Sequence, residues 1–247
     1  MPGDVYLVGA GPGDIGLITV RGLELIAAAD VIIYDQLANP DLLGHARKDA
    51  KLIDVGKQGG LHKVKQEGIN EMIIEESMRN QLVVRLKGGD PFLFGRGGEE
   101  AEELRKAGVS VHVVPGVTSA IAAPAMAGIP VTHRDHAPMV TFVTGHERDD
   151  RPDERIDWNV LANTGGTIVI LMGMARLGHN MARLIDGGMD PSTPVAVVHR
   201  GSTPFQKVVL STVKDVEEEC RQKGVGSPAV VVVGGVATLR GILGDLQ

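Results

Sequence analysis

Short apolar runs separated by polar or glycine-rich segments recur along the whole chain. Five runs in the first half are rich in β-branched residues and have the length of strands; they cover residues 5–9, 31–34, 51–55, 82–86 and 111–115. Apolar residues at helical spacing fill three of the intervals, over residues 19–29, 66–79 and 98–106. Thr19 is placed to cap the first of these helices and Gly108 to end the third. Strands that alternate with helices form βαβ units, so this half predicts an α/β domain with a mostly parallel five-stranded sheet.

The second half contains five further strand-like runs, over residues 140–145, 167–173, 194–201, 207–212 and 229–235. The connection between the third and fourth of these runs is too short for a crossover helix, so we expect that pair to be antiparallel and the second five-stranded sheet to be mixed. The segment that joins the halves is interrupted by Pro115, Pro124 and Pro130. We therefore predict two α/β domains, residues 1–114 and 115–247.

Composition and charge narrow the class of protein. The chain has 247 residues, enough for two modest cores, and its 43% hydrophobic and 23% charged residues are typical of a soluble globular protein. A net charge of −6 and only 3% aromatic residues argue against a nucleic-acid binder. The one cysteine, Cys220, excludes an internal disulfide. Because no signal-peptide pattern or long apolar run is present, we expect a cytoplasmic protein without membrane or nucleic-acid partners.

The turn GAGPGDIG, which follows the first strand, imitates a dinucleotide fingerprint. Read from Gly11, its letters fit GxGxxG, and Asp30 and Asp35 follow at about the distance of a ribose contact. However, Pro12 removes an N–H donor and Asp14 places a carboxylate where the phosphates would lie. The turn therefore suits an uncharged or cationic ligand better than a diphosphate. A nucleotide-binding oxidoreductase is kept as the alternative from another class.

Four blocks of sequence together point to a family. They are VYLVGAGPGDIGLITVRGLELIAAADVIIYD, VGKQGGLHKVKQEGIN, VVRLKGGDPFLFGRGGEE and VVPGVTSAIAAPAMAGIPVTHR, and they occur in this order. Over nearly its whole length the chain resembles the tetrapyrrole methylases, most specifically in LKGGDPFLFGRGGEE and GIPVTHR. The resemblance implies two α/β domains with the methyl donor, S-adenosylmethionine, in the cleft between them, usually in a homodimer. It further implies methylation of uroporphyrinogen III at carbons 2 and 7, which yields precorrin-2 by way of precorrin-1 and two molecules of S-adenosylhomocysteine.

The resemblance also implies which residues bind the methyl donor. S-adenosylmethionine carries a sulfonium and no phosphate, so its site needs close main chain for the adenine and ribose edges, which glycines allow. Asp90 would offer a carboxylate to the ribose hydroxyls or to the ammonium. The implied donor-binding residues are Pro12, Gly88, Gly89, Asp90, Leu93, Thr118, Ser119, Met172 and Gly201.

Acceptor binding and proton transfer call for other residues. A tetrapyrrole with eight carboxylates requires local positive charge on this acidic chain. By resemblance, Arg96 and Arg134 clamp its acidic arms, and Glu99 orients Arg96 or a pyrrole N–H. Asp35 is the implied base and Lys57 the implied proton donor. Both follow predicted strands at their carboxyl ends, where open α/β sheets place their ligands.

Departures from the family pattern leave rival hypotheses open. The sequence differs at Gln36, Gln58, Lys63 and His199-Arg200, several of which lie in loops expected near the acceptor. A methylase of a later corrin intermediate or of the haem d1 branch is one rival, and a nucleoside sensor without turnover is another. No metal is expected, because Arg134 separates His133 from His136 and no cysteine or carboxylate cluster accompanies them.

Overall fold

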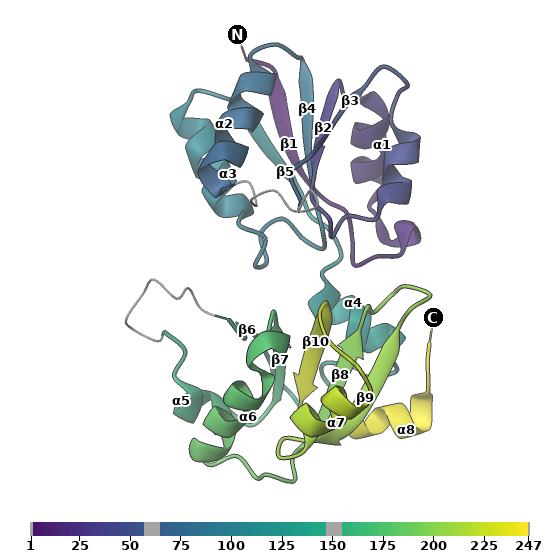
Figure 1. Cartoon of the computed structure of the whole chain (residues 1–247), viewed down its shortest axis with the longest axis vertical. Coiled ribbons are helices and arrows are strands. Elements are labelled where there is room, and N and C mark those ends of the chain that lie inside the picture. The colour runs from purple at the N-terminus through teal and green to yellow at the C-terminus, as the bar shows by residue number, and fades with distance from the viewer. Residues whose placement is uncertain (1, 57–64, 147–154, 247) are drawn as a thin grey trace. The chain divides into compact units, whose positions relative to one another are not determined.

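The computed structural model describes residues 2–56, 65–146 and 155–246. The chain forms two compact units, Met1–Thr118 and Ser119–Gln247, which are coloured along the sequence in Figure 1. Each unit contains one five-stranded sheet. The predicted class, α/β with two sheets, is confirmed.

All neighbouring strands of the first sheet are parallel. The strand order is β3-β2-β4-β1-β5. The strands are β1 (Asp4–Gly9), β2 (Val31–Tyr34), β3 (Lys51–Asp54), β4 (Leu82–Lys87) and β5 (Val111–Val114). Because every strand runs the same way, all five end at one edge, called here the C-terminal edge of the first sheet. The loops that carry chemistry in an open parallel sheet are expected at this edge.

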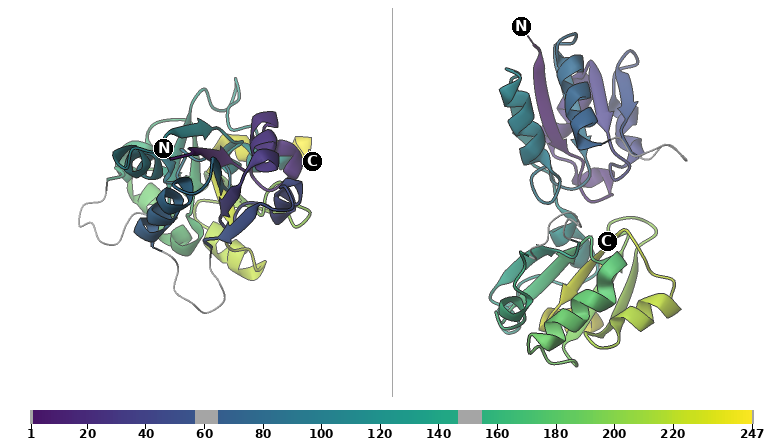
Figure 2. Two further views of the ribbon diagram at one scale, coloured as in Figure 1. Left: turned by 90° about the horizontal axis from the view of Figure 1, so that it is seen from above. Right: turned by 60° about the vertical axis from the view of Figure 1, so that its left-hand side comes forward.

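Helices cover both faces of the first sheet (Figures 1 and 2). Helix α1 (Val20–Ala28) packs on one face, and α2 (Gln66–Ser77) and α3 (Gly97–Lys106) pack on the other. The predicted caps are confirmed: the hydroxyl of Thr19 accepts a hydrogen bond from the backbone N–H of Gly22 at 3.0 Å, and Gly108 follows α3 with φ of 75°. Successive apolar residues along each strand point to opposite faces of the sheet, so each face has its own core.

The second sheet is mixed, with the order β6-β7-β10-β8-β9. Its strands are β6 (Val140–Thr144), β7 (Thr167–Leu171), β8 (Pro194–His199), β9 (Lys207–Thr212) and β10 (Ala229–Val233). Strand β8 pairs with β9 in antiparallel register, as the short connection predicts. Strands β6 and β7 are parallel, and β10 is antiparallel to both β7 and β8. Strands β6, β7 and β8 therefore end at one edge, called here the C-terminal edge of the second sheet.

Helix α4 (Ser119–Met126) opens the second unit and packs against β7 and β10. It contains Pro124, one of the residues expected to interrupt this segment. Small buried residues on its inner side, Ala120, Ala122 and Ala123, allow close packing on the sheet, and this burial offsets the hydrogen bond that proline cannot donate. The other helices are α5 (Trp158–Ala162), α6 (Leu177–Asp186), α7 (Val216–Gln222) and α8 (Arg240–Leu243).

Candidate active site

The glycine-rich loops that follow β1 and β4 are joined through their main chains. The backbone N–H of Gly11 donates to Gly89 O at 3.2 Å, and the N–H of Gly89 donates to Gly11 O at 2.7 Å. A Cβ on Gly9 would lie 2.5 Å from the Cα of Gly116, which follows β5. Glycine is therefore required where these three loops touch one another.

Gly88 likewise allows two loops to pack closely against each other. A Cβ at this position would lie 2.5 Å from the Cβ of Leu37, in the loop after β2. The sequence analysis explains Gly88 and Gly89 by the approach of a ligand, whereas the structure shows that the contact with Leu37 already requires glycine at position 88 and that a φ of 66° favours glycine at position 89. A contact of either residue with the methyl donor stays a prediction.

Asp90 organises the loop between β4 and α3. Its Oδ1 accepts the backbone N–H groups of Phe92 at 2.8 Å and Leu93 at 3.0 Å, and its Oδ2 accepts that of Gly116 at 3.0 Å. The carboxylate thus fixes its own turn and ties it to the loop after β5. Since a carboxylate has about four acceptor positions, a direct contact with a ligand remains open to it.

The turn after β1 lacks the features of a phosphate cradle. Asp14 Oδ1 accepts the backbone N–H of Gly16 at 2.8 Å, so its negative charge caps a short 3-10 helix (Ile15–Leu17). Pro12 has no N–H to offer, and the carbonyl of Gly13 accepts from the side chain of Asn39 at 2.7 Å. A diphosphate would meet a carboxylate here, which weighs against the oxidoreductase alternative.

Strained main chain gathers in three of the loops that the sequence analysis selects. Among the described residues, the non-glycine residues with positive φ are Phe94, Arg96, Met172, Arg200 and Ser202. They follow β4, β7 and β8, next to the predicted site residues Leu93 and Gly201. Such conformations cost about 1–3 kcal/mol each and concentrate at functional sites. No sequence pattern reveals them, because none of these residues is a glycine.

Arg96 and Glu99 form a two-point ion pair at the start of α3. Arg96 Nε lies 3.1 Å from Glu99 Oε1, and its Nη2 lies 2.7 Å from Oε2. The pair holds the Arg96 guanidinium beside Glu99. That Glu99 orients Arg96 or a pyrrole N–H for an acceptor stays a prediction. Both side chains are about half exposed. They also border a groove between α2 and α3 that is lined by Glu67, Glu71, Glu102 and Glu103, so an acidic acceptor would be repelled from that side.

In the second unit, the structure brings Gly201 and the middle of α4 together. A Cβ on Gly201 would lie 2.9 Å from the Cα of Ala123, so α4, whose first residue is Ser119, packs on the loop after β8. Met172 follows β7 at the same edge of the sheet, with φ of 56° and its side chain half exposed. Thr118 is the last residue of the first unit.

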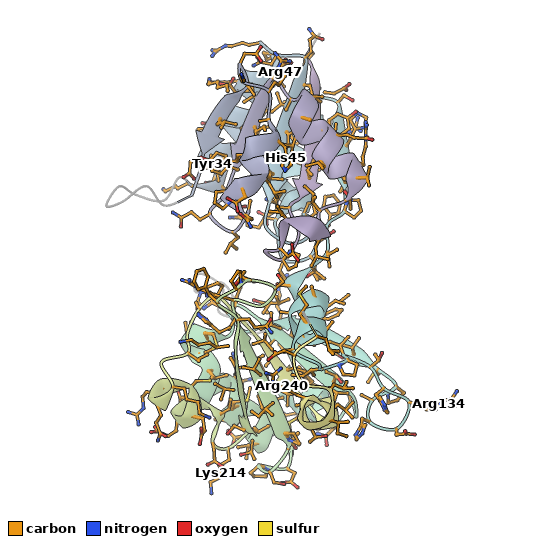
Figure 3. All side chains as sticks on the ribbon, turned by 90° about the vertical axis from the view of Figure 1, so that its right-hand side faces the viewer. Tyr34, His45, Arg47, Arg134, Lys214 and Arg240 are labelled. Atoms are coloured by element: carbon orange, nitrogen blue, oxygen red, sulfur yellow. The ribbon has the colours of Figure 1, made fainter. Side chains whose placement is uncertain are left out.

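Arg134 lies elsewhere in the second unit. It occupies a turn closed by a bridge between His133 and Ala137, just before β6 begins. The neighbouring His136 faces Gly235, which follows the end of β10. This is the edge opposite to Met172 and Gly201, and Figure 3 shows Arg134 projecting outward from the second unit. The structure therefore does not bring Arg134 together with the donor residues of its own unit.

Asp35 directly follows β2 at the C-terminal edge of the first sheet. Its Oδ1 accepts the backbone N–H of Leu37 at 3.1 Å, and its Oδ2 lies 3.4 Å from Nη2 of Arg85. About 28% of the Asp35 side chain is exposed, so the carboxylate is fixed yet accessible. Lys57, the predicted proton donor, lies outside the described residues.

The sequence analysis missed a group of buried charges beneath Asp35. Arg85 and Lys87 on β4 point toward Glu100 on α3, and the three residues are called here the buried charge cluster. Glu100 Oε1 accepts from Lys87 Nζ at 2.9 Å and from Arg85 Nε at 3.3 Å. Burial, together with the nearby charge of Arg85, lowers the pKa of Lys87. The available signal was the spacing of Arg85 and Lys87, which places both on one face of an otherwise apolar strand.

Within residues 2–56, 65–146 and 155–246, no three His, Cys, Asp or Glu side chains are grouped as metal ligands would be. In the same ranges, no helix combines the length and the apolar character needed to cross a membrane.

Comparison with known proteins matches residues 4–217 to the family model of Tetrapyrrole (Corrin/Porphyrin) Methylases. The chain is 49% identical over 243 residues to the S-adenosyl-L-methionine-dependent uroporphyrinogen III methyltransferase of Methanosarcina barkeri, covering 98% of this chain and 95% of that protein. It is also 49% identical over 238 residues to a siroheme synthase of Edwardsiella ictaluri, a match that covers 96% of this chain and 50% of that protein.

Solved structures give the same result at the level of the fold. The uroporphyrin-III C-methyl transferase from Thermus thermophilus, solved in complex with S-adenyl homocysteine, matches with a TM-score of 0.81 and 38% identity. The match covers 96% of this chain and 100% of that chain. The similarity thus includes both sheets described above.

Proposed function

Because the chain belongs to the tetrapyrrole (corrin/porphyrin) methylase family, we propose that it transfers methyl groups from S-adenosylmethionine to carbon atoms of uroporphyrinogen III. The observation that carries this proposal is the 49% identity to a uroporphyrinogen III methyltransferase over 243 residues, nearly the full length of both chains. The proposed products are precorrin-2, formed by way of precorrin-1 after methylation at carbons 2 and 7, and S-adenosylhomocysteine. The proposed assembly is a homodimer.

The loops at the C-terminal edge of the first sheet fit a sulfonium donor better than a nucleotide phosphate. Glycine contacts and Asp90 fix main chain from three loops there, and Asp14 adds negative charge to the turn. Fixed main-chain groups can hydrogen-bond an adenosine without a cradle of N–H donors for phosphate. The residues proposed to hold the donor are Pro12, Gly88, Gly89, Asp90, Leu93, Thr118, Ser119, Met172 and Gly201.

The chemistry requires positioning and the removal of a proton. An electron-rich pyrrole carbon attacks the methyl group, so a carbon–carbon bond forms while the carbon–sulfur bond breaks and the electron pair remains on sulfur as a neutral thioether. The methylated ring, which now carries the positive charge, then loses a proton from a neighbouring carbon or nitrogen and becomes neutral. We assign this proton to Asp35, whose carboxylate is both held in place and accessible. Lys57 is the proposed proton donor.

The acceptor is proposed to bind through its carboxylates. Arg96 presents a guanidinium that Glu99 already orients, and charge-assisted hydrogen bonds of this type contribute about 1.5–3 kcal/mol each. Arg134, at the opposite edge of the second sheet, is proposed to contact the acceptor separately from Arg96.

Two measurements test the proposal together. We expect titration calorimetry to show binding of S-adenosylhomocysteine, and an anaerobic assay with S-adenosylmethionine to deliver two methyl groups per uroporphyrinogen III, counted by product mass. The matched control is Asp35→Asn, which should bind S-adenosylhomocysteine like the original protein and methylate slowly. Binding without methylation would instead favour another tetrapyrrole acceptor or a nucleoside sensor. An absence of binding would refute the methyltransferase assignment.

A further inference from the structure

The buried charge cluster is an unusual feature of the first unit. Charged side chains are almost never fully buried unless they are paired, yet Glu100 is 0% exposed, Arg85 4% and Lys87 5%. Buried ion pairs can often be replaced by apolar residues without loss of stability. Stability alone is therefore a weak reason for this cluster.

The hydrogen bonds of Glu100 are unevenly distributed. Its Oε1 accepts from Lys87, from Arg85 and from Gln66 Nε2 at 3.1 Å, whereas Oε2 is buried without a hydrogen-bond partner among the described residues. An unsatisfied buried oxygen carries a desolvation cost of about 1–3 kcal/mol. All the hydrogen bonds that hold the Glu100 carboxylate are therefore made by Oε1, the oxygen that contacts Arg85 and Lys87.

Arg85 links Glu100 to Asp35, which lies at the C-terminal edge of the first sheet. Its Nη1 donates to the backbone oxygens of Ile33 at 3.3 Å and Leu86 at 3.1 Å, while Nε contacts Glu100. The guanidinium is therefore fixed in one orientation. Its remaining nitrogen, Nη2, lies 3.4 Å from Oδ2 of Asp35. The contacts thus run from Glu100 through Arg85 to Asp35. Glu100 and Arg85 are buried, whereas the side chain of Asp35 is partly exposed.

We propose that Glu100 and Arg85 are positioning residues for the proton-accepting step: Glu100 fixes the guanidinium of Arg85, and Arg85 fixes the carboxylate of Asp35. Neither residue transfers a proton itself. The proton leaves the methylated macrocycle, is accepted by the Asp35 carboxylate and passes to water. This inference rests on the proposed methyl transfer and adds two residues to it that act only through Asp35.

A double-mutant cycle between Glu100→Gln and Asp35→Asn tests the inference. Glutamine keeps the shape of Glu100 but removes the charge that orders Arg85. We expect Glu100→Gln to lower kcat about 10- to 100-fold, because small errors of position have effects of this size. The KM for S-adenosylmethionine and the Kd for S-adenosylhomocysteine should stay within about twofold, since donor-binding loops are untouched. In the Asp35→Asn background, Glu100→Gln should lower kcat by less than about twofold.

The control is Glu102→Gln on the same helix, where the glutamate is exposed and pairs with Lys106. It should leave kcat unchanged in both backgrounds. Rates are followed with a methyl-labelled donor, so that slow variants are measurable. If Glu100→Gln does not fold, Arg85→Lys replaces it in the cycle, because lysine keeps the charge but loses the fork that contacts both carboxylates.

The outcomes separate this inference from the proposed function. Equal losses of kcat in both backgrounds, or an unchanged kcat in Glu100→Gln, would overturn the positioning role while wild-type methylation still stands. A wild-type protein that does not methylate uroporphyrinogen III would overturn the proposed function itself.

Discussion

The two sheets end in different ways at their C-terminal edges. The first sheet has ionised side chains beneath its edge, namely the buried charge cluster, and Asp35 above it. The buried polar residues described in the second unit are uncharged: Thr167, Asn180 and Ser202. Main chain with positive φ at non-glycine residues follows strands of both units, at Phe94 and Arg96 in the first and at Met172, Arg200 and Ser202 in the second.

This contrast indicates a division of labour. Buried charges fix the orientation of reacting side chains, whereas a main chain held at positive φ fixes the direction of its peptide groups. We infer that the first unit supplies side-chain chemistry in addition to main-chain contacts, whereas the second unit supplies main-chain contacts. The predictions below test each half of this comparison, beginning with the largest expected effect.

Glu100→Ala should be the most damaging change to stability. It removes the anion that faces Arg85 and Lys87 and leaves two buried cations without it, so we expect the free energy of unfolding to fall by about 3–5 kcal/mol. Urea denaturation measures the change. Glu102→Ala on the exposed side of the same helix should change it by less than about 0.5 kcal/mol. Similar losses of unfolding free energy in the two variants would show that the buried charge cluster does not depend on Glu100 for its stability.

Gly116→Ala tests the contact between the loops of the first sheet. Its Cβ would lie 2.7 Å from the Cα of Gly9, with no flexible side chain able to yield, so we expect a loss of about 3 kcal/mol and weaker binding of S-adenosylhomocysteine. Thermal unfolding and calorimetry measure the two effects. Gly98→Ala is the matched control, because nothing lies within 4 Å of its Cβ position. A Gly116→Ala protein as stable as Gly98→Ala would contradict the described packing.

Met172→Gly tests the strained main chain of the second sheet against Met172→Ala. Both variants remove a side chain that is half exposed, but only glycine relieves the positive φ. We expect the glycine variant to be the more stable of the two by about 1 kcal/mol, the reverse of the usual order. The denaturant midpoints of the two variants show which of them is more stable. An alanine variant that is more stable would mean that Met172 is not strained.

Cys220 probes the apolar core of the second unit, with the smallest effect on the protein. The thiol lies on the buried side of α7, and burial raises its pKa. A raised pKa keeps the thiolate fraction low, so alkylation by iodoacetamide at mildly alkaline pH should be at least about tenfold slower in the folded chain than in urea. The rate should rise at higher pH than it does for the unfolded chain. Equal rates would show that this core is open to water.

The fold was largely predictable because apolar periodicity determines where strands lie. The short connection before β9 even predicted an antiparallel pair. Helix α4 was harder to predict, because proline suggests interruption while the burial of its alanines, which favours the helix, depends on a sheet that is distant in sequence. The strand order likewise depends on packing between segments far apart in the chain.

The site was predictable only in part. Motif letters selected Asp90 and the neighbouring glycines, but not the loop contacts that they make. Strand periodicity placed Arg85 and Lys87 on one face of β4, yet it does not tell whether solvent or a helix covers that face. Positive φ at Met172 and Arg200 leaves no trace in the residue type. These features arise from tertiary contacts, which single-sequence patterns do not contain.

The most direct test of the account is the single-turnover rate at which Asp35→Asn forms the neutral, deprotonated methylated product, with S-adenosylmethionine and uroporphyrinogen III both saturating. If side chains of the first unit perform the proton transfer, the rate falls by about 100-fold or more while the Kd for S-adenosylhomocysteine stays at the wild-type value. A wild-type rate in this variant would contradict the assignment of the chemistry to that edge of the first sheet.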